Sequence, residues 1–97
     1  MSEKFSSLNE AIMNLVEKIR LADDLNKEDI DDLYLQLEKF CDLYEGEEVV
    51  PKETAYGLFV LHDNLEGALK HTSGSDLKLI SNVNSKVNEY IERIFLS

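Results

Sequence analysis

Residues 27–45 read KEDIDDLYLQLEKFCDLYE and contain neither glycine nor proline. Their apolar side chains recur at steps of three and four residues, at Ile30, Leu33, Tyr34, Leu37, Phe40, Cys41 and Tyr44. A helix of about 3.6 residues per turn gathers such positions on one face. Asn26 can cap this helix, and Glu28 and Asp29 lie in its first turn, where carboxylates favour the positive end of the helix dipole. The stretch therefore predicts an amphipathic helix over 27–45.

Three further segments show the same apolar spacing, and they predict helices over 8–22, 51–70 and 76–95. Pro51 suits the first position of a helix because its missing N–H would have no partner there. Connections as short as these join neighbouring helices in antiparallel fashion. We therefore expect an all-α fold, an antiparallel four-helix bundle of up-down-up-down topology, with 1–97 as a single domain.

Burial is expected to differ among the helices. The apolar residues of 51–70, Tyr56 and Phe59 among them, cover most of the helix circumference, which predicts that this helix is the most buried of the four. The four tyrosines are expected in the core with their hydroxyl groups at its rim: Tyr34, Tyr44, Tyr56 and Tyr90.

Composition excludes several classes of function. Ten Lys and Arg face twenty Asp and Glu, so the formal charge of −10 repels phosphate backbones and anionic lipid headgroups. We therefore expect no binding to nucleic acid or to a membrane, and no stretch approaches the roughly 18 apolar residues of a membrane helix. The single cysteine cannot form an internal disulfide, which favours a cytoplasmic location.

The negative charge is concentrated in one part of the chain. Residues 1–50 hold 14 acids and 5 bases, whereas residues 51–97 hold 6 acids and 5 bases. At about 100° per residue, several carboxylates of the helix over 27–45 fall in one arc beside its apolar stripe, with Leu35 in the middle of that arc. A large apolar side chain ringed by carboxylates is typical of an electrostatically steered interface. The candidate partner contacts of this region are Asp24, Glu28, Asp31, Asp32, Leu35, Glu38, Asp42 and Glu45.

Patterns typical of catalysis or metal binding are incomplete in this sequence. Asp24, Asn26 and Glu28 match the first ligand spacings of a calcium-binding EF-hand loop, but Asp29 replaces the turn glycine and Leu35 the last ligand. Cys41 belongs to an apolar stripe, where a thiol acts as a small hydrophobic group. His62 and His71 are interpreted as structural. We therefore expect no enzyme activity, no cofactor and no metal.

Residues 71–77, HTSGSDL, resemble the H-P-x-G-S-D-L segment of the immunity proteins that bind and inhibit nuclease colicins. That family consists of small, acidic, four-helix proteins, and the resemblance covers seven of 97 residues. In the family the Asp-Leu pair is followed by one residue and two tyrosines that carry much of the nuclease contact. Here Lys78, Leu79 and Ile80 stand in those places, so the resemblance implies a contact role for Asp76 alone.

Two hypotheses about function follow. The first is an immunity or antitoxin-like protein that neutralises a cognate bacterial toxin, a nuclease, by offering an acidic face to a basic protein partner. The second is a regulatory or scaffolding bundle, monomeric or homodimeric, with an interface on its third or fourth helix. On the second hypothesis the acidic face is only a solvated exterior.

Overall fold

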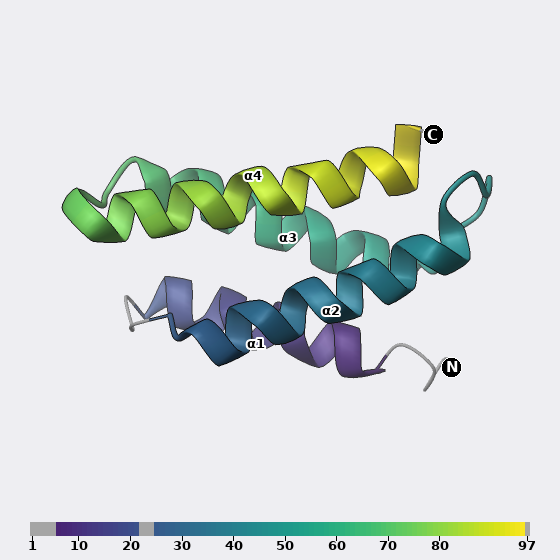
Figure 1. Ribbon diagram of the computed structural model, residues 1–97, viewed down its shortest axis with the longest axis horizontal. Coiled ribbons are helices and arrows are strands. Elements are labelled where there is room, and N and C mark those ends of the chain that lie inside the picture. The colour runs from purple at the N-terminus through teal and green to yellow at the C-terminus, as the bar shows by residue number, and fades with distance from the viewer. Residues whose placement is uncertain (1–5, 22–24, 97) are drawn as a thin grey trace.

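A computed structural model describes residues 6–21 and 25–96, and it contains four helices and no strand within these residues. They are α1 (Ser6–Arg20), α2 (Lys27–Tyr44), α3 (Lys52–Leu69) and α4 (Gly74–Leu96). Consecutive helices run in opposite directions along the long axis of the molecule (Figure 1). The prediction of an all-α four-helix bundle whose consecutive helices are antiparallel is confirmed. The expectation that each short connection joins neighbouring helices is wrong for the connection between α2 and α3, because these two helices share few contacts.

The helices are arranged as two hairpins packed on each other. α1 packs against α2 and α3, and α4 also packs against α2 and α3, so α2 and α3 are diagonal in the bundle. The connection 45–51 therefore crosses from one hairpin to the other, and α2 lies beside the parallel helix α4 (Figure 1). Because diagonal helices share few contacts, the outer faces of α2 and α3 point to opposite sides of the molecule.

Helix ends lie within two residues of the predicted ones. α1 begins and ends two residues earlier than expected, and Ala22 lies outside the described residues. Asn26 caps α2 as predicted, since its side-chain oxygen accepts a hydrogen bond from the Asp29 N–H at 2.8 Å. Pro51, with φ −59°, is the N-cap of α3 and not its first helical residue.

Helix α4 begins at Gly74, two residues before the expected start. Gly74 has a φ of 66°, in the left-handed region that glycine tolerates without a steric penalty. This backbone conformation lets the chain leave α3 and enter α4 through a short turn.

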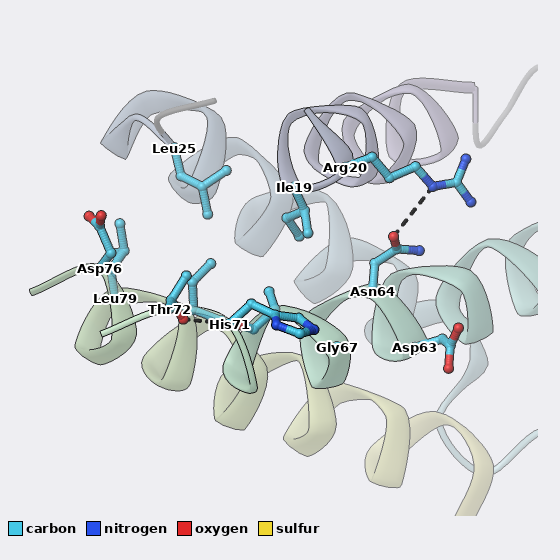
Figure 2. Close-up of a pocket in the computed structure, with 12 residues that line it drawn as sticks. Ile19, Arg20, Leu25, Asp63, Asn64, Gly67, His71, Thr72, Asp76 and Leu79 are labelled. Atoms are coloured by element: carbon cyan, nitrogen blue, oxygen red, sulfur yellow. Dashed lines mark hydrogen bonds between the residues drawn. The ribbon is translucent and has the colours of Figure 1, made fainter. Parts of the chain in front are cut away.

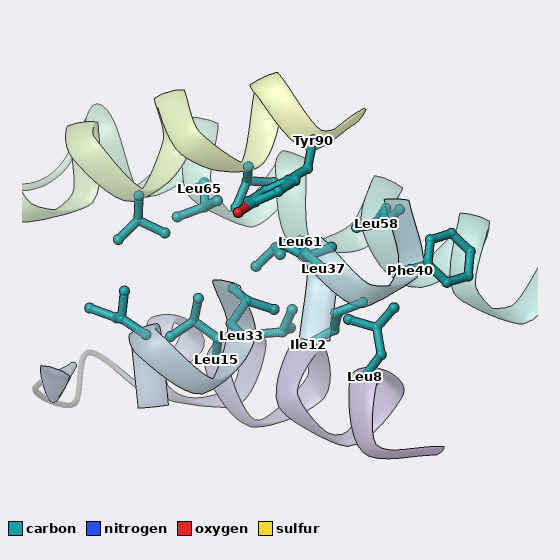
Figure 3. Packing of buried hydrophobic residues seen from close by; sticks show 14 of the residues in the cluster. Leu8, Ile12, Leu15, Leu33, Leu37, Phe40, Leu58, Leu61, Leu65 and Tyr90 are labelled. Atoms are coloured by element: carbon teal, nitrogen blue, oxygen red, sulfur yellow. The ribbon is translucent and has the colours of Figure 1, made fainter. Parts of the chain in front are cut away.

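The core lies between the two hairpins and draws on all four helices (Figure 3). Its largest fully buried side chains include Leu8, Ile12, Leu15, Leu33, Leu37, Phe40, Leu58, Leu61, Leu65, Val83 and Ile94. Each fully buried aliphatic side chain contributes about 1.5–3 kcal/mol relative to an exposed one. α1 and α3 approach closely at Gly57, where an added Cβ would contact the Ile12 side chain at 3.6 Å.

Two polar side chains of the helix interfaces are buried. Thr54, fully buried, donates its hydroxyl hydrogen to the Asn9 side-chain amide oxygen at 3.0 Å. Asn84 donates to the Glu66 carboxylate at 2.9 Å, which ties α4 to α3. The groups that have such a partner avoid most of the cost of losing water, whereas the Asn84 side-chain oxygen is buried without a hydrogen-bond partner among the described residues.

The expected burial of α3 is wrong for its outer face. Tyr56 is 71% exposed and Phe59 is 68% exposed. The reason is that each helix in a ring of four has only two neighbours, which for α3 are α1 and α4, so the side of α3 turned away from both is open to solvent. Tyr56 is thus not a core residue, whereas Tyr90 is buried and Tyr34 and Tyr44 are partly buried against the core.

Substitution of two leucines of α2, which are two positions apart, distinguishes the buried face of this helix from its exposed face. Leu37→Ala is expected to lower the free energy of unfolding by about 2–5 kcal/mol, because Leu37 is fully buried. Leu35→Ala, at a half-exposed position on the same helix, should change it by no more than about 0.5 kcal/mol. Urea unfolding followed by circular dichroism measures both; equal losses would contradict the helix orientation.

Candidate functional site

The solvent side of α2 carries most of the predicted partner contacts. We define the α2 outer face by five exposed residues: Glu28, Asp31, Asp32, Leu35 and Asp42. Leu35 is 54% exposed at the centre of this face. The bases of α2 are Lys27, which forms an exposed ion pair with Asp31 at 3.3 Å, and Lys39. This face therefore combines an accessible apolar side chain with a clear excess of carboxylates.

Two of the predicted contacts, Glu38 and Glu45, lie at the seam between α2 and α4. The Arg93 guanidinium of α4 lies between them, with one nitrogen 3.3 Å from Glu38 and another 3.3 Å from Glu45. Arg93 thus neutralises part of the carboxylate ridge. Glu38 and Glu45 thus connect the two hairpins through Arg93, whereas the residues of the α2 outer face contact no other helix in this way.

Tyr90 adds a second contact to this seam. Its hydroxyl donates a hydrogen bond to the Glu38 carboxylate at 3.0 Å, and this bond, with Arg93 beside it, holds the pKa of Glu38 below its usual value of 4.5. Burial, followed by the nearby carboxylate, raises the pKa of Tyr90 to about 12. The pKa of Arg93 is raised by its hydrogen bonds to Glu45 and Glu38, so its charge is permanent.

Asp29, in the first turn of α2, lies at the contact between α2 and α1. Lys18 of α1 donates a hydrogen bond to the Asp29 carboxylate, and this contact lowers the pKa of Asp29. The carboxylates of α2 therefore fall into two groups. Those at the edges of the helix are paired with bases of α1 and α4, and those on the outer face point to solvent.

A pocket of about 530 Å³ lies at the end of the bundle where α3 passes into α4 (Figure 2). Its lining residues come from α1, α3, α4, the turn between α3 and α4, and the segment before α2: Ile19, Arg20, Leu25, Asp63, Asn64, Gly67, Ala68, His71, Thr72, Asp76, Leu79 and Ile80. Arg20 donates to the Asn64 side-chain oxygen at 3.3 Å across one edge (Figure 2). The lining residues come from separate segments of the chain, and the sequence does not show which of these segments meet, so it did not reveal the pocket.

Asp76 lines this pocket and does not belong to the α2 outer face. Figure 2 shows its carboxylate at the same end of the pocket as Leu25, which precedes α2. His71 is exposed and also lines the pocket. Asp24, the remaining predicted contact, lies outside the described residues.

The remaining titratable side chains interpreted as structural lie in packed surroundings. Cys41 is fully buried, and burial raises the pKa of its thiol to about 11, so the thiol stays protonated at neutral pH. His62 is partly buried, with Nδ1 3.1 Å from the Asn88 side-chain oxygen. Within residues 6–21 and 25–96, no three His, Cys, Asp or Glu side chains are grouped so that they could hold a metal ion.

Comparisons of the chain with protein-family models, with curated proteins and with solved structures find no match. In the part of the chain that the structure describes, no helix is long and apolar enough to cross a membrane.

The contact between α2 and α4 predicts that the fold loses stability as the pH falls, because Glu38 becomes protonated. The pKa of Glu38 is lower in the folded chain than its usual value, so its ionised form stabilises the fold above that value, and the stabilisation is lost as the pH falls through the lowered pKa. We expect Glu38→Gln to reduce the loss of stability between about pH 6 and about pH 3.

The cause of the shift can be tested by NMR titration of the Glu38 carboxyl carbon. Tyr90→Phe removes the hydroxyl donor and should raise the pKa of Glu38. Tyr34→Phe is the matched control, because Tyr34 contacts the Tyr90 ring without donating to Glu38. An unchanged pKa of Glu38 in Tyr90→Phe would refute the assigned cause.

Proposed function

We propose that this chain is a cytoplasmic immunity protein of the antitoxin type, which neutralises a basic bacterial toxin of the nuclease class through the α2 outer face. It binds the toxin and performs no chemistry on it. The observation that carries the proposal is the exposed Leu35, surrounded by carboxylates that no base from another helix neutralises within the described residues. The resemblance of residues 71–77 to nuclease-colicin immunity proteins supports the class of function.

Repulsion between like charges within α2 indicates that this face serves a purpose other than stability. Like charges at i,i+3 and i,i+4 cost a helix a few tenths of a kcal/mol each, and Glu28 has Asp31 and Asp32 at these two positions. Where a carboxylate of α2 faces α4, Arg93 compensates it. The fold therefore neutralises the carboxylates at the edge of α2 with a base of another helix. On the outer face, within the described residues, only Asp31 pairs with a base, Lys27 of the same helix, and this ion pair is exposed.

Electrostatics also suit the proposed partner. A nuclease holds its substrate in a basic cleft, and an array of carboxylates can occupy such a cleft in place of phosphates. Complementary charge raises the association rate, toward about 10⁸ M⁻¹s⁻¹ at low salt, while a central apolar side chain slows dissociation. Leu35 is the proposed anchor, and the surrounding carboxylates pair with Lys or Arg of the toxin.

Glu38, Glu45 and Asp76 have lesser parts in the proposal. Glu38 and Glu45 border the α2 outer face, and their side chains remain 47% and 42% exposed although Arg93 pairs with both. Asp76 lies at the end of the molecule where α2 begins, so we assign it an edge contact. Asp24 stays a proposed contact on sequence grounds alone.

A second candidate function, a regulatory or scaffolding bundle, is favoured by a different observation. Tyr56 and Phe59 expose two aromatic rings on the outer face of α3. Exposed aromatic side chains of this kind are typical of protein interfaces. On this alternative the partner covers α3 and the carboxylates of α2 only maintain solubility.

The two functions differ in their response to charge reversal. Wild-type chain is used to isolate its partner from the native host, and the association rate is then measured for the variant Asp31→Lys/Asp32→Lys/Asp42→Lys. We expect this variant to associate at least about tenfold more slowly at low salt and to lose most of the salt dependence of the rate.

The matched control is Glu53→Lys/Glu89→Lys/Glu92→Lys, which changes the net charge equally at exposed positions of α3 and α4. It should keep most of the wild-type rate. The immunity proposal also requires that the partner be a toxin whose activity the wild-type chain suppresses. Equal slowing by both variants, or a partner without toxic activity, would overturn it.

A further inference from the structure

The outer face of α3 carries a stripe of exposed side chains with two aromatic rings in its N-terminal half. Its members follow alternating steps of four and three residues: Lys52, Tyr56, Phe59, Asp63, Glu66 and Lys70. This is the spacing of the contact positions of a coiled coil, which places them on one side of the helix. Tyr56 and Phe59 are 71% and 68% exposed. Within the described residues, neither Lys52 nor Asp63 forms an ion pair or a side-chain hydrogen bond.

This face is also suited by its charge to meet another copy of the same acidic chain. Residues 52–70 hold three acids and two bases, whereas residues 27–45 hold seven acids and two bases. Two copies that approach through α3 therefore bring together nearly neutral surfaces. An approach through α2 would place two strongly negative faces against each other.

We propose that a second copy of this chain packs on the outer face of α3, with the two α3 helices antiparallel about a two-fold axis. A two-fold interface requires a surface that is complementary to itself. If Tyr56 lies opposite Phe59 of the second copy, then Phe59 lies opposite Tyr56 of that copy. The same register places Lys52 opposite Asp63 of the second copy. By symmetry, Asp63 lies opposite Lys52 of that copy, so each aromatic pair is flanked by an ion pair.

Other arrangements of the same stripe are unfavourable. Sliding the helices by one heptad places Lys52 opposite Lys70 and Phe59 opposite Asp63 of the second copy. A parallel arrangement places every charged residue opposite its own counterpart. Both juxtapose like charges or bury an aromatic ring against a carboxylate, which disfavours them relative to the proposed register.

The size of the contact predicts a weak, concentration-dependent dimer. A fully covered aromatic side chain buries about 150–250 Å², and Tyr56 and Phe59 still expose 71% and 68% of their surface, so four rings supply on the order of 400–700 Å². This area is below the roughly 1,200 Å² of specific, stable interfaces and is typical of weak, transient contacts. Because α2 and α3 are diagonal, the dimer would leave both α2 outer faces accessible on its far sides. The inference does not depend on the proposed function, since it concerns the chain alone.

Sedimentation equilibrium of the full chain, from about 1 µM to about 1 mM, tests the dimer and its register. We expect the wild-type chain to dimerise within this range. Lys52→Asp should weaken dimerisation at least about tenfold, because it faces Asp63 of the second copy, and Asp63→Lys should do the same through Lys52. The double variant Lys52→Asp/Asp63→Lys should recover dimerisation.

Two controls keep the result specific. Lys78→Asp makes the same charge change at an exposed position of α4 and should leave dimerisation intact. Tyr56→Ser/Phe59→Ser should abolish it while the helical circular dichroism is retained, because both side chains are exposed. A chain that stays monomeric throughout the range would overturn the proposal. So would a dimer that is indifferent to Lys52→Asp, or one that the double variant fails to restore.

Discussion

Burial of the apolar stripe of α2 is the constraint on which the rest of the structure depends. Leu33 and Leu37 are completely buried between the two hairpins, together with Phe40. Rotating α2 about its axis by even one residue, about 100°, would expose these side chains and bring carboxylates into the core. The core therefore fixes the direction in which Leu35 and Asp42 point. The candidate interface is a consequence of packing on the opposite side of the same helix.

Charge is used in two different ways along α2. At the seams it contributes to packing: Asp29 accepts from Lys18 of α1, and Glu38 accepts from Tyr90 and Arg93 of α4. In the described part of the chain, the carboxylates of the outer face have no such partners from other helices, and they surround an exposed leucine. A protein that needed acidic residues only for solubility would not need to gather them around an apolar side chain, and this contrast within a single helix supports a binding role.

Much of the fold could be predicted from the sequence because apolar spacing is a local property. The helices and the solvent position of Leu35 follow from such spacing. The neighbours of each helix do not, since the same stripes allow several ring orders. Arg93 could be recognised as the partner of Glu38 and Glu45 only once α4 was known to lie beside α2. The exposure of Tyr56 has the same origin, because a helix that is apolar around its circumference gives no sign of which side is left uncovered.

The central claim is that the molecule meets its basic partner through the α2 outer face and that this partner does not contact the outer face of α3. Amide chemical-shift mapping tests it most directly, using the isotope-labelled chain and the basic protein isolated with it. The account predicts that the largest changes centre on Leu35 and extend along α2 from Glu28 to Asp42, while the outer face of α3 changes little. Changes centred on Tyr56 and Phe59, with α2 unaffected, would contradict it.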